Sequence, residues 1–266
     1  MLTNYHTHST FCHGNDTPEQ IVSAAIDKGF SAIGFSGHGF TPFDFRYCMQ
    51  DTEAYVAEIT RLKAAYAGKL QIYLGAEEDA YEIVDRSRFD YIIGSCHYFY
   101  VDGQYYPVDS NYDYFRKCLE LFQYDPVKMA HAYYGHFCQY IQTRKPDIIG
   151  HFDLITKFSE KDGPNFFDHK GYRETAKTYA TIAADTGCLF ELNTGAISRG
   201  ARITPYPHED ILRIIRNAGS SVVLSSDSHE IKTLDFGFSQ ARTYLKDMGF
   251  QYVYCLYDGE FKKDYL

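Results

Sequence analysis

Two histidines near the N-terminus, His6 and His8, have the spacing of a metal-binding pair. In an extended segment the side chains of residues i and i+2 point the same way, about 7 Å apart, so two imidazoles can hold one ion between them. The pair alone is weak support for a metal site, because histidines two residues apart arise by chance. Where the other histidines and acids fall along the chain decides the question.

Seven short apolar segments alternate with helical patterns. The expected strands are residues 2–7, 32–35, 70–74, 91–94, 147–150, 189–192 and 222–224, and the expected helices are 17–29, 51–67, 126–143, 172–186, 207–218 and 238–248. The sequence Asp-Gly predicts a hairpin turn at 102–103 and again at 258–259. Alternating strand and helix units are typical of a parallel sheet, and short apolar strands covered by helices favour a barrel. We predict an α/β fold, a distorted (β/α)7 TIM-like barrel, in a single domain spanning residues 1–266.

In such barrels, chemistry gathers at the C-terminal rim of the strands. Six of the seven expected strands deliver a side chain that can bind metal to this rim. In chain order these residues are His6 and His8, His38, Glu77, His97, His151, and Asp227 with His229. Imidazole and carboxylate ligands without thiolate fit zinc, with iron and manganese as alternatives. We therefore predict a metal cluster at this rim, and we expect His131, His136, His169 and His208, which fall in helices or loops, to be surface or packing residues.

The composition excludes some partners. A net charge of −9 leaves no basic field to hold a polynucleotide, so nucleic acid is not expected as a partner. No apolar run approaches the roughly 18 residues needed to span a membrane. Seven cysteines without CxxC spacing, together with an N-terminus that lacks a signal-peptide pattern, lead us to expect reduced thiols in a cytoplasmic protein.

Seven motifs surround the candidate ligands. They are HTHSTFCH from His6 to His13, SGHG around His38, GAEED around Glu77, GSCHYF around His97, GHFDL around His151, ELNTG around Asn193, and SSDSH around Asp227 and His229. In these motifs and their order, from residue 2 to about residue 243, the chain resembles the polymerase and histidinol phosphatase (PHP) family, and within it the histidinol-phosphatase branch. The stretches GHFDLITKF, ELNTG and GFSQA are those that favour this branch.

The resemblance implies three divalent ions, with zinc the first choice. His6, His8, Glu77 and Asp227 would hold the first ion; Glu77 would bridge to a second held by His97 and His151; His13, His38 and His229 would hold the third. Glu78 is the other candidate for the bridge. Because it is one residue further along a strand, we expect it to face elsewhere.

Divalent ions lower the pKa of bound water and clamp phosphate oxygens for in-line attack at phosphorus. Lys157 and Arg199 follow two of the motifs at the same rim, and we expect them to contact the phosphate and not the ions; the alternative for each is a solvated loop cation. With Glu77 and Asp227, they are the predicted catalytic residues. The predicted contacts for the rest of the substrate, in the rim loops, are Asp44, Asp79, Tyr98, Phe99, Tyr106 and Asn193.

The resemblance thus implies a metal-dependent phosphomonoesterase that hydrolyses L-histidinol phosphate to L-histidinol and phosphate in histidine biosynthesis. Two alternatives stay open: a PHP-family phosphoesterase for another small ester, such as a nucleotide or sugar phosphate, and a metal-binding regulatory domain without turnover. The second alternative expects lost ligands, and none is missing here. The expected partner is a small phosphate monoester, and the sequence leaves the oligomeric state open.

Overall fold

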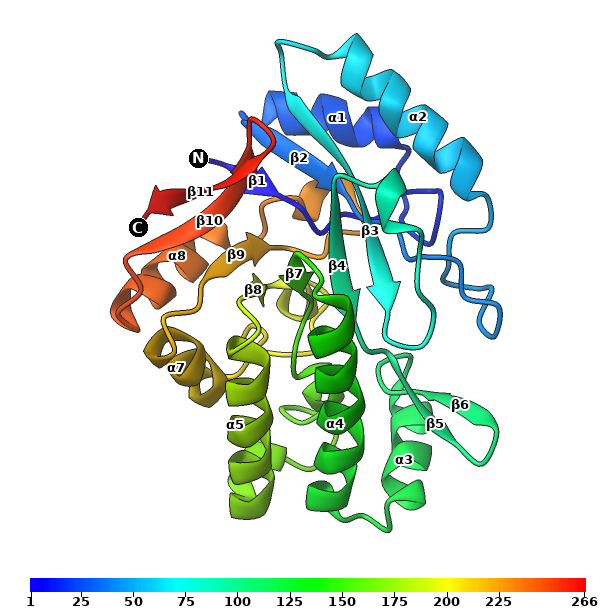
Figure 1. The fold of residues 1–266 in the computed structure, drawn as a ribbon, viewed down its shortest axis with the longest axis vertical. Coiled ribbons are helices and arrows are strands. Elements are labelled where there is room, and N and C mark those ends of the chain that lie inside the picture. The colour runs from blue at the N-terminus through cyan, green and yellow to red at the C-terminus, as the bar shows by residue number, and fades with distance from the viewer.

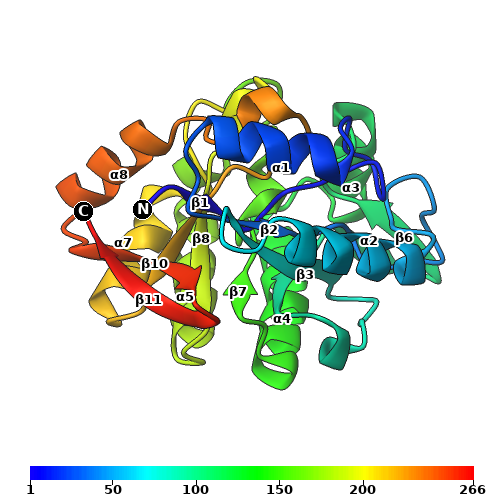
Figure 2. The same ribbon diagram turned by 90° about the horizontal axis from the view of Figure 1, so that it is seen from above.

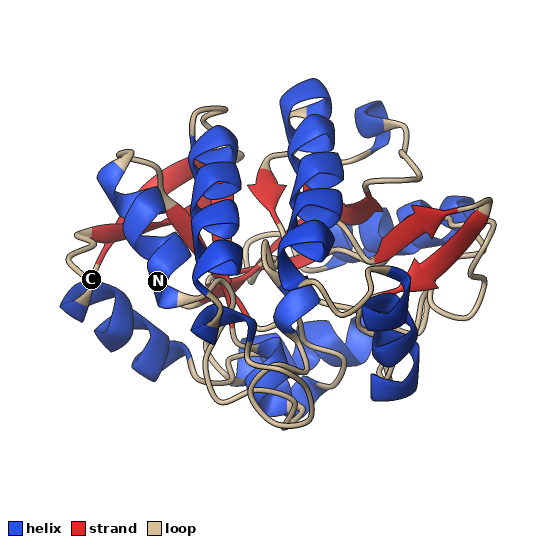
Figure 3. Cartoon of the chain, turned by 90° about the horizontal axis from the view of Figure 1, so that it is seen from below, coloured by secondary structure: helices blue, strands red, loops and turns tan.

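The computed structural model describes residues 1–266. Its centre is a nine-stranded sheet in which eight strands run parallel and the last is antiparallel (Figure 1). In sheet order the strands are β1 (Thr3–Asn4), β2 (Ala32–Phe35), β3 (Gln71–Asp79), β4 (Tyr91–Ser95), β7 (Ile148–Ile149), β8 (Leu189–Asn193), β9 (Val222–Ser225), β10 (Tyr252–Tyr257) and β11 (Glu260–Tyr265). A separate hairpin of β5 (Tyr98–Val101) and β6 (Gln104–Pro107) stands apart from this sheet (Figure 3).

The chain forms eight α-helices, most of which cover the outside of the sheet. They are α1 (Pro18–Asp27), α2 (Thr52–Ala65), α3 (Tyr112–Leu121), α4 (Pro126–Arg144), α5 (Lys170–Ala184), α6 (Gly195–Ser198), α7 (Glu209–Asn217) and α8 (Phe238–Asp247). α3 packs instead against β6. α1 and α2 pack against β2 and β3 through an apolar cluster that includes Ile21, Phe35 and Ile59 (Figure 2). α4 and α5 lie side by side (Figure 1) and share a second cluster through Phe137 and Tyr172. None of the helices combines the length and the apolar composition needed to cross a membrane.

The parallel strands close into a barrel where the segment after β1 meets the segment after β9. Thr7 and Ser228 form a parallel bridge there. The His8 N–H donates to the Ser228 carbonyl at 2.8 Å, and the Ser228 N–H donates to the His6 carbonyl at 3.1 Å. β1 to β4 and β7 to β9 thus form a distorted (β/α)7 barrel, as predicted. The closing bridge lies among the residues predicted to bind metal.

Aromatic side chains fill the end of the barrel opposite the predicted site. The Tyr91 hydroxyl donates to the Tyr5 carbonyl at 2.5 Å. A Cβ on Gly34 or Gly75 would lie 2.3 Å from the Tyr91 side chain, so these glycines leave the room that the phenol needs. The C-terminal hairpin of β10 and β11 covers this end, since Leu256 joins the same cluster and its carbonyl accepts from the Tyr5 hydroxyl at 2.7 Å.

All seven predicted strands and six predicted helices are present. The capping box at the start of α1 forms between Thr17 and Gln20, and both Asp-Gly turns form hairpins. The third strand does not stop at Leu74 as predicted but continues to Asp79, because its polar end pairs with β4. α3, for which the sequence pattern predicted no element, begins at an Asn111 cap.

Candidate metal centre

Alternation along the strands decides which polar side chains enter the barrel. On β3, Ile72 and Leu74 pack toward the outer helices while Tyr73 faces the interior. The inward residue at the carboxyl end of this strand is therefore Glu77. On the other strands and the segments that follow them, the same two-residue period leads from buried interior residues to the polar residues His38, His97, Glu191 and Asp227.

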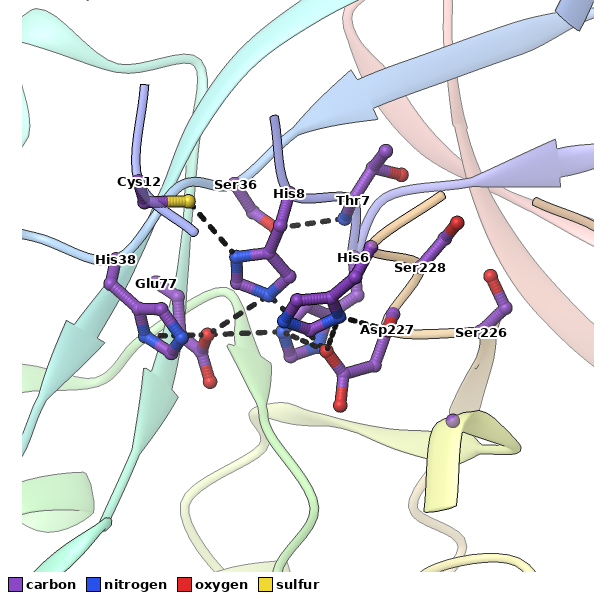
Figure 4. A network of polar contacts seen from close by, with 12 residues as sticks. His6, Thr7, His8, Cys12, Ser36, His38, Glu77, Ser226, Asp227 and Ser228 are labelled. Atoms are coloured by element: carbon purple, nitrogen blue, oxygen red, sulfur yellow. Dashed lines mark hydrogen bonds and ion pairs between the residues drawn. The ribbon is translucent and has the colours of Figure 1, made fainter. Parts of the chain in front are cut away.

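The Glu77 carboxylate lies at the centre of a histidine cluster (Figure 4). From its Oε2 the distances are 3.1 Å to His6 Nε2, 3.4 Å to His8 Nε2 and 3.0 Å to His38 Nδ1, and from its Oε1 they are 3.1 Å to His151 Nε2 and 3.3 Å to His97 Nε2. Asp227 joins from the closing segment, with its Oδ1 3.2 Å from His8 Nε2. Each Glu77 oxygen therefore faces a different set of imidazoles.

A second group of donors lies beside the first. One nitrogen from each of four histidines lies within 4.8 Å of the others; they are His8, His13, His38 and His229. The His8 ring stacks on those of His38 and His229, with centroids 4.5 Å and 4.3 Å away. The structure thus brings together the three residues predicted for the third ion, and His8 and His38 link this group to Glu77.

The donor atoms that face one another lack hydrogen-bond partners in the protein. These atoms include Nε2 of His6 and of His8 and both oxygens of Glu77, all buried. Lone pairs brought together in the interior without a donor between them cost free energy, and a divalent cation supplies the missing partner. The residues therefore fit metal, and imidazole with carboxylate is a donor set that zinc accepts.

The surroundings favour the metal-binding forms of Glu77 and His13. Burial opposes ionisation of Glu77, but His38, His6 and His97 hold the pKa of its carboxyl well below its usual range. Burial, aided by His38 and His229, lowers the pKa of His13 to about 3. An ionised carboxylate and a neutral imidazole are the forms that bind metal ions. Despite burial, neighbouring carboxylates raise the pKa of His6 and of His97, so these two imidazoles must lose a proton when metal binds.

Three residues contact the Nδ1 atoms of cluster histidines, on the side of each ring away from its Nε2; they are Glu191, Cys12 and Asp79. Glu191 was missed by the sequence analysis: its Oε2 lies 2.8 Å from His6 Nδ1, and its Oε1 accepts from the His151 N–H at 2.5 Å. The signal was available, since two-residue alternation on β8 turns Glu191 inward with Asn193. Cys12 Sγ lies 3.4 Å from His8 Nδ1 (Figure 4).

Asp79 is the third of these residues. The sequence predicted it as a substrate contact, and it does line the cavity. Its Oδ2, however, lies 3.0 Å from His97 Nδ1 and also accepts from the His97 N–H at 3.0 Å. Its carboxylate therefore orients an imidazole of the cluster.

Glu78 faces away from the cluster, as expected from its place on β3. Its carboxylate accepts from Arg144 at 2.7 and 3.0 Å, from the Tyr140 hydroxyl at 2.7 Å and from the Val84 N–H at 2.7 Å. These bonds fix β3 to α4, and none reaches the histidines.

Both predicted phosphate-binding cations line the cavity above the cluster. The Lys157 Nζ donates to the Asp109 carbonyl at 2.6 Å, with the Asp109 carboxylate 3.4 Å away. Arg199 donates to the Asp227 carboxylate at 2.7 Å. The fold thus places the Arg199 guanidinium on one of the predicted metal-binding residues, while the side chain still lines the cavity.

The cavity has a volume of about 260 Å³. Beyond the cluster and the two cations, its wall includes Asp44, Tyr98, Tyr47, Asp109 and Tyr206. The Tyr98 hydroxyl donates to the Asp44 carboxylate at 3.2 Å, so these two predicted substrate contacts lie together in the wall.

Three predicted substrate contacts lie outside the cavity. Phe99 follows Tyr98 on β5 and so faces the opposite way, into the main core, where its ring lies 4.7 Å from that of Phe122. Asn193 is fully buried, donates to Glu191 at 2.8 Å and accepts from the Gly195 N–H at 2.8 Å. The Tyr106 hydroxyl donates to Gln104 at 2.9 Å on the outer hairpin. These three predictions are wrong because strand alternation or local turn bonds use the side chains elsewhere.

The four remaining histidines lie away from the cluster, as expected. His131 and His136 are on α4, and His169 and His208 cap the N-termini of α5 and α7. Their rings contact other parts of the core: the His208 ring stacks on Phe167 at 3.6 Å between centroids, and His136 Nε2 lies 3.2 Å from the Ala80 carbonyl.

Comparisons with known proteins agree with this geometry. Residues 4–195 match the family model described as the PHP domain. A relative from Schizosaccharomyces pombe named "Probable histidinol-phosphatase" is 28% identical, over 94% of this chain and 87% of that protein. The histidinol-phosphatase of Bacillus subtilis is 24% identical, over 88% of this chain and 95% of that protein.

A solved structure has the same fold. It is the histidinol phosphate phosphatase from Lactococcus lactis subsp. lactis in complex with zinc, L-histidinol and phosphate, which aligns with a TM-score of 0.73 at 22% identity over 98% of this chain and 99% of that chain. The family match covers most of the chain and includes five of the seven barrel strands in full. The chain belongs to the PHP domain family.

Proposed function

We propose that this protein is a metal-dependent phosphomonoesterase that hydrolyses L-histidinol phosphate to L-histidinol and phosphate, a step of histidine biosynthesis. The observation that carries the proposal is the convergence of seven histidines on Glu77 and Asp227 at the floor of a cavity that also holds Lys157 and Arg199. The names of relatives that cover nearly the whole chain support the choice of substrate.

The nine donors suit three divalent ions, most simply zinc. When bound, such ions lower the pKa of water and neutralise phosphate charge. Glu77 would serve two ions, since each of its oxygens faces separate imidazoles. Glu191 and Asp79 would hold His6 and His97 in the orientation that directs each Nε2 into the cluster.

Two cations prepare the cavity for a phosphate dianion. Arg199 donates to Asp227 and lines the cavity beside His229. Lys157 lines the cavity from the loop after β7. Charge-assisted hydrogen bonds from such groups orient the phosphate over the cluster. The cavity also holds the carboxylates of Asp44, Asp79 and Asp109, so the bound metal ions would supply most of the positive charge that admits an anion.

The cavity wall suits a compact cationic alcohol. L-histidinol carries an ammonium group and an imidazole, and the Asp44 and Asp109 carboxylates lie in the wall as acceptors with the Tyr47 and Tyr98 phenols beside them. At about 260 Å³ the cavity lies just below the roughly 300–1,000 Å³ range of ligand pockets, which favours a small ester over a nucleotide.

The second candidate is a PHP-family phosphoesterase for another small monoester, because the metal cluster contacts only phosphate. A regulatory domain without turnover is less well supported, since all nine donors and both cations are in place.

A panel of monoesters tests the proposal. Metal-loaded protein is assayed for phosphate release from L-histidinol phosphate, p-nitrophenyl phosphate, glycerol phosphate and nucleoside monophosphates, with Glu77→Gln protein as the blank. A wall that pairs the polar ends of histidinol penalises analogues without them. We expect kcat/KM for L-histidinol phosphate to exceed the others by at least about a hundredfold. Similar kcat/KM values for all the esters, or the highest value for a nucleotide, would favour the second candidate instead.

A further inference from the structure

Tyr206 is the feature of the cavity that the proposed function leaves unused. It lies between α6 and α7, is 1% exposed and lines the cavity. Its ring stands edge-on to that of His151, with centroids 6.2 Å apart. Arg199 and Lys157 line the same cavity.

The Tyr206 hydroxyl is buried and has no hydrogen-bond partner in the protein. The other fully buried tyrosines all have one; they are Tyr5, Tyr55, Tyr91, Tyr133, Tyr134 and Tyr172. An unpartnered buried hydroxyl costs free energy and calls for an explanation. Tyr206 is thus the exception among the fully buried tyrosines, and a partner for its hydroxyl must come from outside the protein.

The ring is held firmly in place. Tyr206 and Asn193 exchange two backbone hydrogen bonds, at 2.8 and 3.0 Å. The buried Arg202 guanidinium lies over the ring, 4.4 Å from its centroid, and is itself bound to Glu160 at 3.0 Å. A cation over the face fixes the ring and draws charge from the phenol, which strengthens the hydroxyl as a donor.

We propose that Tyr206 donates a hydrogen bond from its hydroxyl to a phosphate oxygen of the bound ester. The inference rests on the proposed phosphatase function. A neutral phenol is a donor, and an anionic oxygen is the strongest acceptor that the proposed function brings into this cavity. Arg202 is a positioning residue, because it acts only through the ring.

The test replaces Tyr206 by Phe and compares it with Tyr172→Phe. Tyr172 is equally buried but lies in the core, where its hydroxyl is paired with that of Tyr134 at 2.8 Å. The probe is inorganic phosphate, titrated calorimetrically into metal-loaded protein, so the result does not depend on which ester is hydrolysed. Metal content and thermal unfolding of both variants are measured alongside.

Tyr206→Phe should weaken phosphate binding by about tenfold to a hundredfold, as loss of a hydrogen bond to a charged group does, with metal content unchanged. Its unfolding temperature should stay the same or rise, whereas that of Tyr172→Phe should fall with phosphate binding intact. Unchanged phosphate affinity in Tyr206→Phe would overturn the inference, and so would a loss of stability matching that of Tyr172→Phe. Wild-type protein that binds phosphate but hydrolyses no histidinol phosphate would overturn the proposed function alone.

Discussion

Glu77 and Glu78 are chemically identical neighbours with opposite surroundings. The Glu77 carboxylate faces five imidazoles inside the barrel, and the Glu78 carboxylate faces Arg144 and Tyr140 outside it. The difference comes from the two-residue period of β3.

Glu77→Gln should therefore abolish phosphate release and reduce bound metal, because an amide cannot neutralise two ions and fix their spacing. Glu78→Gln is the matched control: it should keep kcat near wild type and lose about 1–3 kcal/mol of unfolding free energy through the Arg144 pair. Steady-state kinetics and elemental analysis check both. A Glu78 variant more damaging to turnover than the Glu77 variant would mean that the bridge is wrongly assigned.

Glu191 is not itself one of the predicted metal ligands but contacts two of them, His6 and His151. Its carboxylate faces His6 Nδ1 and the backbone of His151, so one side chain joins the ligands of β1 and β7 through β8.

Glu191→Gln should lower metal affinity by about ten- to a hundredfold, because an amide has one accepting oxygen where Glu191 uses two, for His6 and for the His151 N–H, and because the negative charge beside His6 is lost. Competition with a chelator measures this directly. Glu174→Gln, at an exposed position on α5, is the control and should match wild type. Equal affinities for the two variants would show that Glu191 is not needed to orient His6.

At the scale of elements, the loops after β7 and β8 each bring one cation to the cavity. They differ in what holds the cation: Asp109 holds Lys157, and Asp227 of the cluster holds Arg199. The same substitution should therefore have different effects in the two loops.

Lys157→Met should raise KM by about tenfold and leave metal content unchanged, since only a contact to the phosphate is lost. Arg199→Met should also weaken metal binding, because Asp227 loses the guanidinium that helps hold its pKa well below its usual range. Kinetics and metal titration of the two variants separate these effects. If both variants had the kinetics of the wild type, Lys157 and Arg199 would be solvated loop cations without a role in phosphate binding.

At the scale of the whole molecule, the cluster joins the two ends of the barrel sheet. His6 and His8 follow the first barrel strand, and Asp227 and His229 follow the last, on either side of the Thr7–Ser228 bridge. Metal bound here cross-links segments more than 200 residues apart in sequence.

Purified protein should hold three divalent ions per chain by elemental analysis. Chelation should lower the unfolding temperature by on the order of 10 °C, because metal at a thousand times its dissociation constant stabilises the folded state by about 4 kcal/mol. Re-addition of zinc should restore both stability and activity. One ion or none, with no gain on adding metal, would contradict the three-ion proposal.

Much of this architecture could be predicted because it follows from local rules. Thr17 and Gln20 start α1, Asp258 and Gly259 turn the last hairpin, and strand alternation separates Glu77 from Glu78. The convergence of ligands from distant motifs was also predictable, since the carboxyl ends of parallel strands share one rim.

The remaining features depend on which loops meet. The bond from Arg199 to Asp227, the support of His6 by Glu191 and the unpartnered hydroxyl of Tyr206 join segments that no local pattern relates. Phe99 was misplaced for the same reason, since sequence cannot say which side of an outer hairpin faces the cavity. Local sequence patterns were enough to predict the strands, the polar residues that follow them and so the set of candidate ligands. Closure of the barrel, through contacts between residues far apart in the chain, decided how those side chains pair and which face the cavity.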